Sequence, residues 1–202
     1  MISMTEIHDA SLENLSRWWR NPSETPGDFE EDDALDEIAY GLSQHDPEGV
    51  RVLKDFLHDK THRGRAALWF LAWPELVDDE IREALAAAFD SDDTRTKYTA
   101  LLGHIHAKHF VLSKAQIAGC KDPGNQRLAA LAMVYQCRAN PENRIEILKK
   151  ALAHTNPRMR EYACDEIGDF GIKELAPHMT PLLNDAHQDV AESAKSNSEI
   201  VG

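Results

Sequence analysis

An internal repeat of about 31 residues constrains this chain more than any other feature. Between residues 147 and 200 the sequence nearly repeats itself. Three apolar positions recur 31 residues further on, as Leu152 and Leu183, Met159 and Val190, and Ala163 and Ala194. An apolar helical pattern at such a fixed period is typical of solenoid proteins, in which neighbouring units stack to bury their apolar faces. The repeat therefore predicts a stack of similar helical units.

The sequence upstream continues this pattern as helix, short turn, helix, with no alternating strand candidates. The predicted helices pair as 47–58 with 63–73, 78–89 with 94–106, 110–118 with 125–137, 141–153 with 157–170, and 173–183 with 187–200. A small residue aligns in the second helix of each pair, namely Ala67, Ala100, Ala130, Ala163 and Ala194. One and four positions later the first four helices carry mostly apolar residues, whereas the fifth carries Lys195 and Ser198. We expect one buried stripe that turns polar in the last unit, because a terminal repeat exposes one face to water.

The unit at residues 148–170 carries the features by which this arrangement resembles the HEAT-repeat family. Asn156-Pro157-Arg158-Met159-Arg160 and Ala163 match the turn, apolar residue, Arg and Ala of that family. Three positions before the aligned alanine, the middle helices carry a basic residue, and Gly64 and Ala191 replace it at the two ends. The resemblance covers residues 47–200. It implies an all-α fold, a short right-handed α-solenoid of about five HEAT-like helix pairs with an N-terminal helical cap.

The chain is expected to divide into an acidic N-terminal helical segment, residues 1–46, and a HEAT-like repeat array, residues 47–202. The N-terminal segment contains helix candidates at 9–20 and 32–44, joined by a linker rich in Pro, Gly and acids. Residues 1–60 hold 15 acidic and 5 basic side chains, so they carry most of the net charge of −13. The run Glu30-Glu31-Asp32-Asp33 interacts favourably with a helix dipole there, or forms a patch for a basic partner.

Composition argues against several classes of protein. No stretch approaches about 18 uninterrupted apolar residues, and the first residues lack a basic region followed by an apolar run, so we expect no membrane span or secretory signal. Three cysteines without a CxxC motif favour a reducing compartment, and the expected location is cytoplasmic, with a processed periplasmic chain as the alternative. Lys and Arg are not clustered as phosphate binding requires, so no nucleic-acid partner is expected.

Positions 2 before, 2 after and 6 after each aligned alanine lie opposite the buried stripe at 100° per residue. The second helices of HEAT-like arrays usually line the concave side, so the resemblance places these rows in a groove. The candidate partner-binding residues are Arg65, Trp69, Trp73, Tyr98, Leu102, His106, Gln136, Glu161, Asp165 and Asp169. The N-terminal end of this groove is aromatic, as suits anchors of a protein interface, and its C-terminal end is acidic. The alternative for the two tryptophans is core packing beneath the N-terminal segment.

No pattern in the sequence indicates an active site. His104, His106 and His109 form an HxHxxH run, but helix geometry separates the first two by roughly 200°, which favours a structural or solvated role over a metal site. The sequence contains no Ser–His–Asp set, HExxH or Gly-rich phosphate loop, so no catalytic residue, metal or cofactor is expected. Cys120 follows a predicted helix end, where it is an exposed thiol or, as is commoner for Cys, buried and inert.

These observations favour a non-catalytic protein-binding α-solenoid that holds a protein partner in its concave groove. Size and acidity suit a neutraliser of a basic protein, similar to a toxin's immunity protein, acting as a monomer or weak homodimer. One alternative is an enzyme on a HEAT-like scaffold, similar to alkylpurine DNA glycosylases or bilin lyases. In the glycosylase case Trp69, Trp73 and Tyr98 would act with Asp165 or Asp169. The other alternative is a structural subunit of a homo-oligomer.

Overall fold

The computed structural model describes residues 6–7, 9–27, 30–121 and 124–201. All regular elements in these ranges are helices, which confirms the all-α prediction. The chain divides into two compact units, Met1–His109 and Phe110–Gly202. The boundary expected after residue 46 falls inside the first unit, between two of its helices. No helix within the described ranges has the length and apolar character needed to cross a bilayer.

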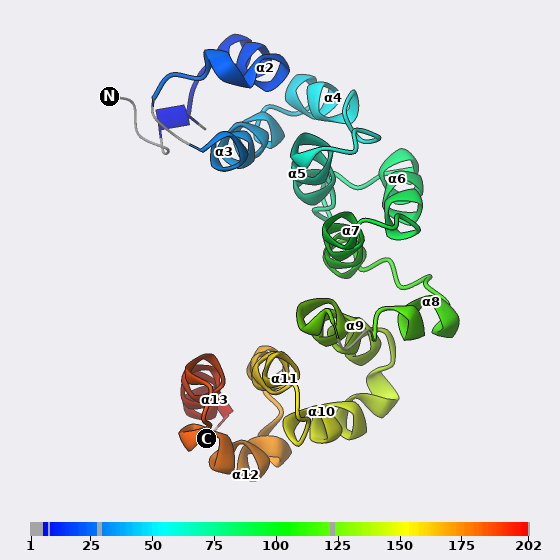
Figure 1. Ribbon diagram of the computed structural model, residues 1–202, viewed down its shortest axis with the longest axis vertical. Coiled ribbons are helices and arrows are strands. Elements are labelled where there is room, and N and C mark those ends of the chain that lie inside the picture. Colours follow the sequence, from blue (N-terminus) through cyan, green and yellow to red (C-terminus); the bar gives the residue numbers. More distant parts are fainter. Residues whose placement is uncertain (1–5, 8, 28–29, 122–123, 202) are drawn as a thin grey trace. The chain divides into compact units, whose positions relative to one another are not determined.

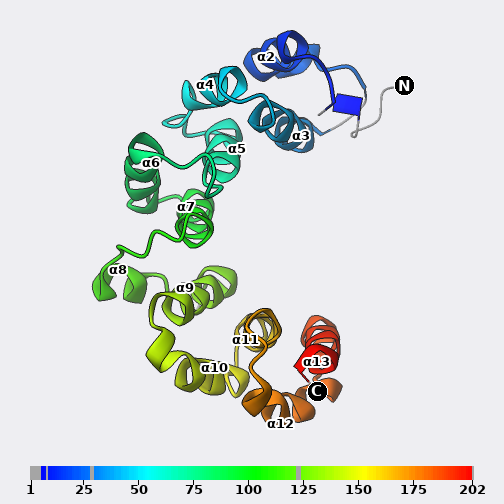
Figure 2. The same ribbon diagram turned by 180° about the vertical axis from the view of Figure 1, so that it is seen from behind.

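The first unit consists of two layers of helices. Its helices are α2 (Leu12–Arg20), α3 (Glu31–Ser43), α4 (Glu48–Lys54), α5 (His62–Leu71), α6 (Asp79–Phe89) and α7 (Thr94–His106), with the 3-10 turn η1 (Pro22–Glu24) after α2. Helices α3, α5 and α7 pack side by side, and α2, α4 and α6 cover them from one side (Figure 1 and, from behind, Figure 2). Helices α2, α4 and α6 therefore leave the opposite surface of α3, α5 and α7 uncovered within this unit.

One hydrophobic core runs through this unit and includes its N-terminal helices. Leu15 and Trp19 of α2 are fully buried in the same cluster as Leu71 and Leu85. The indole of Trp19 also meets Phe56 edge to face, with ring centroids 5.8 Å apart. The predicted helices of the acidic N-terminal segment thus exist, and they are built into the first unit.

Capping side chains mark where several helices of the first unit begin. The side chain of Ser11 accepts the backbone N–H of Asn14 at 3.4 Å, so α2 begins later than the predicted residue 9. Asp78 and Asp93 cap α6 and α7 by accepting the backbone N–H groups of residues three positions later. Such a cap satisfies an N–H group that the helix itself leaves unpaired.

The second unit repeats the two-layer arrangement. Its elements are α8 (Lys114–Gly119), α9 (Gln126–Ala139), η2 (Pro141–Asn143), α10 (Arg144–Leu152), α11 (Pro157–Asp169), η3 (Lys173–Leu175), α12 (Ala176–Met179), η4 (Thr180–Asn184) and α13 (Gln188–Val201). Helices α9, α11 and α13 lie side by side, α10 covers α9 and α11, and α12 with η4 covers α13. The single helix predicted at 173–183 is wrong in detail. Pro177 and Pro181 each lack a donor N–H, and the segment is divided into η3, α12 and η4.

The predicted buried stripe is confirmed. All five aligned alanines, Ala67, Ala100, Ala130, Ala163 and Ala194, are completely buried. The next position is buried in the first four helices and is the exposed Lys195 in the last one. The prediction that positions 2 before and 2 after the aligned alanine lie opposite the buried stripe is wrong in α9, where Leu128 and Ala132 are buried as well. Both side chains are apolar, so at these positions α9 contributes core rather than surface.

Candidate functional site

Two tryptophans and a histidine form an aromatic cluster on α5 and α7. The rings of Trp69 and His106 have centroids 4.4 Å apart, and those of Trp73 and His106 have centroids 6.4 Å apart. Trp69 is partly buried in this contact, whereas Trp73 remains 44% exposed. Both indoles therefore pack against α7, and Trp73 lies on the surface.

Helix α3 extends this surface with residues that were not among the candidates. The ring of Tyr40, which is 37% exposed, lies 6.0 Å from that of Phe70 on α5. One turn and two turns before Tyr40, Asp36 and Asp32 approach the ring nitrogens of His62 at 2.9 and 3.4 Å. Residues four apart share one face of a helix. The spacing of Asp32, Asp36 and Tyr40 is therefore the sequence signal by which these three residues could have been found.

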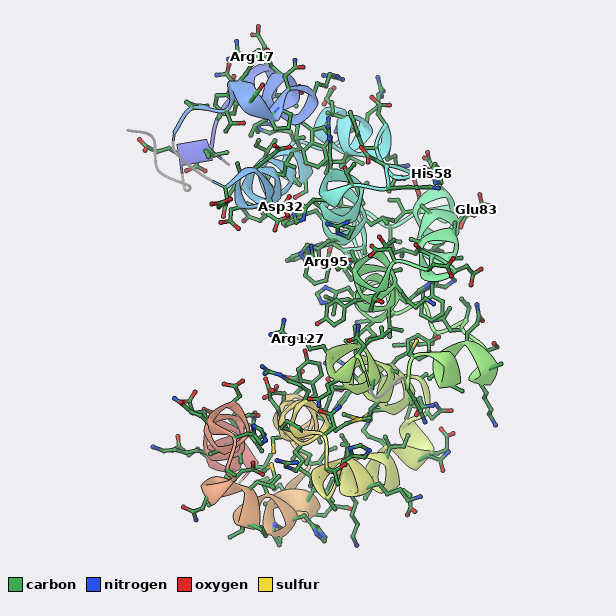
Figure 3. All side chains as sticks on the ribbon, viewed as in Figure 1. Arg17, Asp32, His58, Glu83, Arg95 and Arg127 are labelled. Atoms are coloured by element: carbon green, nitrogen blue, oxygen red, sulfur yellow. The ribbon has the colours of Figure 1, made fainter. Side chains whose placement is uncertain are left out.

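We call this surface the α3–α5–α7 face. The face lies on the side of the first unit to which Asp32 and Arg95 point, whereas His58 and Glu83 point to the opposite side (Figure 3). Two acidic side chains lie in the first turns of α3, the exposed Arg95 lies in the first turn of α7, and the aromatic side chains lie further along the three helices. The members of the face are Asp32, Asp36, Tyr40, His62, Trp69, Trp73, Arg95, Leu102 and His106.

Arg65 holds neighbouring elements together rather than standing free. Its guanidinium lies 3.5 Å from His62 Nδ1 and 4.0 Å from Asp93 Oδ2 at the start of α7. The Thr96 hydroxyl and backbone N–H, with a smaller effect of Arg65, hold the pKa of Asp93 below its usual range. Arg65 therefore lies between His62 and the start of α7, two parts of the α3–α5–α7 face.

Tyr98 and Leu102 of α7, the other candidates in the first unit, are both partly buried.

The four candidates in the second unit lie on α9 and α11, and each of their acids has a hydrogen-bond partner within the unit. Glu161 accepts a hydrogen bond from Arg158 at 2.6 Å, and Asp169 accepts one from Arg138 at 2.9 Å. Gln136 is partly buried on α9. Because arginines neutralise two of the three acids, the expected acidic end of the groove carries less free charge than its sequence suggests.

Asp165 joins α11 to α13. Its Oδ1 accepts hydrogen bonds from Ser193 Oγ at 2.5 Å and from Asn197 Nδ2 at 3.1 Å. Burial raises the pKa of this carboxyl group, and the two hydrogen bonds offset only part of that rise. Gly168 makes the approach possible, because a Cβ at this position would collide with the Asn197 side chain. Asp165 is thus a helix-packing residue in the second unit.

The three histidines of the HxHxxH run do not converge. His104 is completely buried on the aligned core row, as its position predicted, and its ring lies 5.4 Å from that of His109. His106 belongs to the tryptophan cluster described above. Burial, followed by the charge of His109, lowers the pKa of His104 to about 4. Among the described residues, no group of three or more His, Cys, Asp or Glu side chains is placed to hold a metal ion.

The three cysteines are buried and free. Cys120, considered earlier as an exposed thiol, donates to the backbone oxygen of Gln116 at 3.6 Å and is buried. Burial raises the pKa values of Cys137 and Cys164 to about 12. Because the thiolate is the nucleophilic form, these two thiols are chemically inert at neutral pH.

Comparisons with known proteins add no family to this geometry. The chain matches no protein-family model, and no curated protein is similar to it in sequence. The function of the α3–α5–α7 face therefore has to follow from its shape, exposure and charge.

Proposed function

We propose that the chain is a non-catalytic binding protein whose α3–α5–α7 face holds a basic segment of a protein partner. The observation that carries this proposal is the exposure of two large aromatic side chains, Tyr40 and Trp73, on adjacent helices of one face. Large aromatic side chains gathered on a surface typically mark an interaction site, and Trp and Tyr dominate the energetics of protein interfaces. Their partly buried neighbours Trp69 and His106 give the exposed indole a rigid support.

The charge on this face favours a basic partner. Asp32 and Asp36 lie in the first turns of α3, and the exposed Glu31 and Asp33 adjoin them. Lys and Arg side chains of a partner would pair with these carboxylates, and their cations would also bind over the faces of the exposed aromatic rings. Exposed charge of one sign chiefly speeds association, so binding should weaken as salt is raised.

We also propose that both units are HEAT-like stacks of one right-handed α-solenoid built from five helix pairs. The fully buried alanine row supports this, since it places equivalent residues at equivalent depths. Arg160, one of the recurring basic residues, donates two hydrogen bonds of 2.8 Å to Asp185 in the following repeat. The three buried cysteines, which form no disulfide, fit a reducing compartment, and the proposed location is the cytoplasm.

Site-specific photocrosslinking tests the proposed binding face. A benzoylphenylalanine is introduced at Tyr40 on the face and, as a matched control, at the exposed Glu83, which points to the opposite side of the first unit (Figure 3). We expect position 40 to crosslink a discrete protein from a lysate of the source organism, and position 83 to yield none. The crosslinked peptide should be rich in Lys and Arg, and its yield should fall with added salt. Equal yields at both positions, or an acidic crosslinked peptide, would contradict the proposal.

A further inference from the structure

The second unit contains a groove of its own between α9 and α10, with a volume of about 670 Å³. Residues three or four apart on each helix line it, so each helix contributes one continuous stripe. The stripes are Gln126, Ala129, Met133 and Gln136 on α9, and Ile147, Lys150 and Ala151 on α10, with His154 just after the end of α10. The alanines on both helices have short side chains and leave space between the backbones. The volume lies in the range of pockets that bind small organic molecules.

Three large apolar side chains line this groove. Met133 and Ile147 come from the two stripes, and Met159 of α11 adds a second methionine. Methionine side chains are flexible and polarizable, so they adapt to irregular aliphatic ligands. At one end the side-chain amide of Asn156 donates to the backbone oxygen of Gln126 at 3.0 Å, which ties the start of α11 to the start of α9. This end of the groove is therefore held together by a direct bond between its walls.

The charged side chains of the lining are basic although the chain as a whole carries a net charge of −13. Lys121, Lys150 and His154 line the groove, and no Asp or Glu does so among the residues that the structure describes. Lys150 Nζ lies 2.9 Å from Glu146 Oε1 outside the lining, and both side chains are strongly exposed. An exposed pair of this kind is weak, so the lysine can exchange its partner for a ligand anion.

We propose that this groove binds an aliphatic carboxylic acid. The hydrocarbon chain lies against Met133, Ile147 and Met159, where it is removed from water. The carboxylate accepts hydrogen bonds from the ammonium groups of Lys150 and Lys121. Such charge-assisted bonds favour an anionic head group over a neutral or cationic one. This site is independent of the proposed protein partner, since it needs no residue of the α3–α5–α7 face.

Binding of decanoate to the full-length protein tests this site. Carbon-13 NMR of carboxyl-labelled decanoate reports the bound head group, and isothermal titration calorimetry gives the affinity and stoichiometry. We expect one decanoate per chain and no binding of decyltrimethylammonium, which has the same hydrocarbon chain and the opposite charge. Absence of decanoate binding, or equal binding of the cation, would overturn the proposal.

Variants locate the ligand. Lys150→Glu should weaken decanoate binding by about tenfold or more, whereas Lys149→Glu, an exposed neighbour outside the lining, should leave it unchanged. Glu146→Gln should tighten binding, because it releases Lys150 from its present partner. Met133→Trp fills the groove and should abolish binding. Circular dichroism melting shows whether this variant is folded, and Ala129→Leu offers a second way to fill the groove. Equal losses for the two lysine variants, or full binding to the folded filled variants, would refute the site.

Discussion

Trp69 and His106 lie ring against ring across α5 and α7, with their centroids 4.4 Å apart and their planes inclined by 58°. The same imidazole contacts Trp73 edge to face, so one histidine supports both indoles. Trp73 is the more exposed of the two indoles, since Trp69 is partly buried. The two tryptophans, which have equivalent positions in the sequence pattern, therefore have different roles: one packs two helices together and the other presents a free aromatic surface.

Replacing the two tryptophans should separate these roles. Trp73→Ala should lower the free energy of unfolding by less than about 1 kcal/mol, as is usual at exposed positions, and should abolish crosslinking through position 40. Trp69→Ala should cost about 1–3 kcal/mol, because it removes a partly buried aromatic contact. Urea unfolding and the crosslinking yield measure the two effects. If Trp73→Ala left the yield unchanged, the aromatic part of the face would not bind the partner.

His104→Leu should stabilise the first unit at neutral pH. Neither ring nitrogen of this buried histidine has a hydrogen bond of good geometry among the described residues, although backbone groups of His109 and Leu85 lie close to the ring, and a buried unsatisfied polar atom costs about 1–3 kcal/mol. The equivalent positions in neighbouring helices carry Leu71, Val134 and Ile167, all buried, so an aliphatic side chain suits the site. Urea unfolding at pH 7 checks the gain. A variant less stable than the natural protein would show that the imidazole makes interactions beyond packing.

The same histidine predicts a loss of stability in acid. The pKa of His104 is 6.5 in the unfolded chain and about 4 in the folded protein, so between these values the unfolded state binds more protons. Stability is therefore fully present above about pH 6.5 and falls by about 3 kcal/mol as the pH drops toward 4. His104→Leu should remove this part of the pH dependence. Unfolding free energies measured across this range would contradict the prediction if both proteins showed the same slope.

Asp165→Asn should stabilise the second unit at neutral pH. Burial raises the pKa of this carboxyl group in the folded state, so its contribution to stability is greatest in acid and is lost as the pH rises through the folded pKa. An asparagine keeps the Oδ1 acceptor for Ser193 and Asn197 and carries no charge. The melting temperature of the variant should exceed that of the natural protein at pH 7, and the difference should shrink toward pH 3. Asp169→Asn, at an exposed carboxylate bonded to Arg138, should bring no gain.

A buried ion pair joins α9 to α11 and predicts strong coupling. Arg138 donates to both carboxylate oxygens of Glu166, at 2.5–3.0 Å, and Glu166 is almost completely buried. Arg138→Met should cost about 3–5 kcal/mol because it leaves a buried carboxylate without its partner, and adding Glu166→Met should recover much of this loss. A double-mutant cycle in urea measures the coupling. Additive losses from the two single replacements would mean that the pair is not coupled in the folded protein.

Periodicity alone predicted the helices and their buried stripe, since both depend on which residues lie one helical turn apart. It did not predict which acids are already paired with other side chains. The acids Glu161, Asp165 and Asp169 looked like one end of a binding surface, yet each is bound to a neighbouring residue of its unit. Tyr40 and Asp36 were not predicted, because α3 was assigned to the N-terminal segment rather than to the repeats, although they complete the α3–α5–α7 face.

The sequence by itself determined that this chain is helical, where each aligned alanine is buried and which unit ends in polar residues. These properties follow from local spacing and from the burial of apolar surface, which each segment carries with it. Only the tertiary structure decided that Trp73 is open while Trp69 is covered, and that Asp165 serves packing. It also decided that alanines on α9 and α10 face each other across a groove. Exposure and pairing depend on neighbours distant in the chain, and no local pattern contains them.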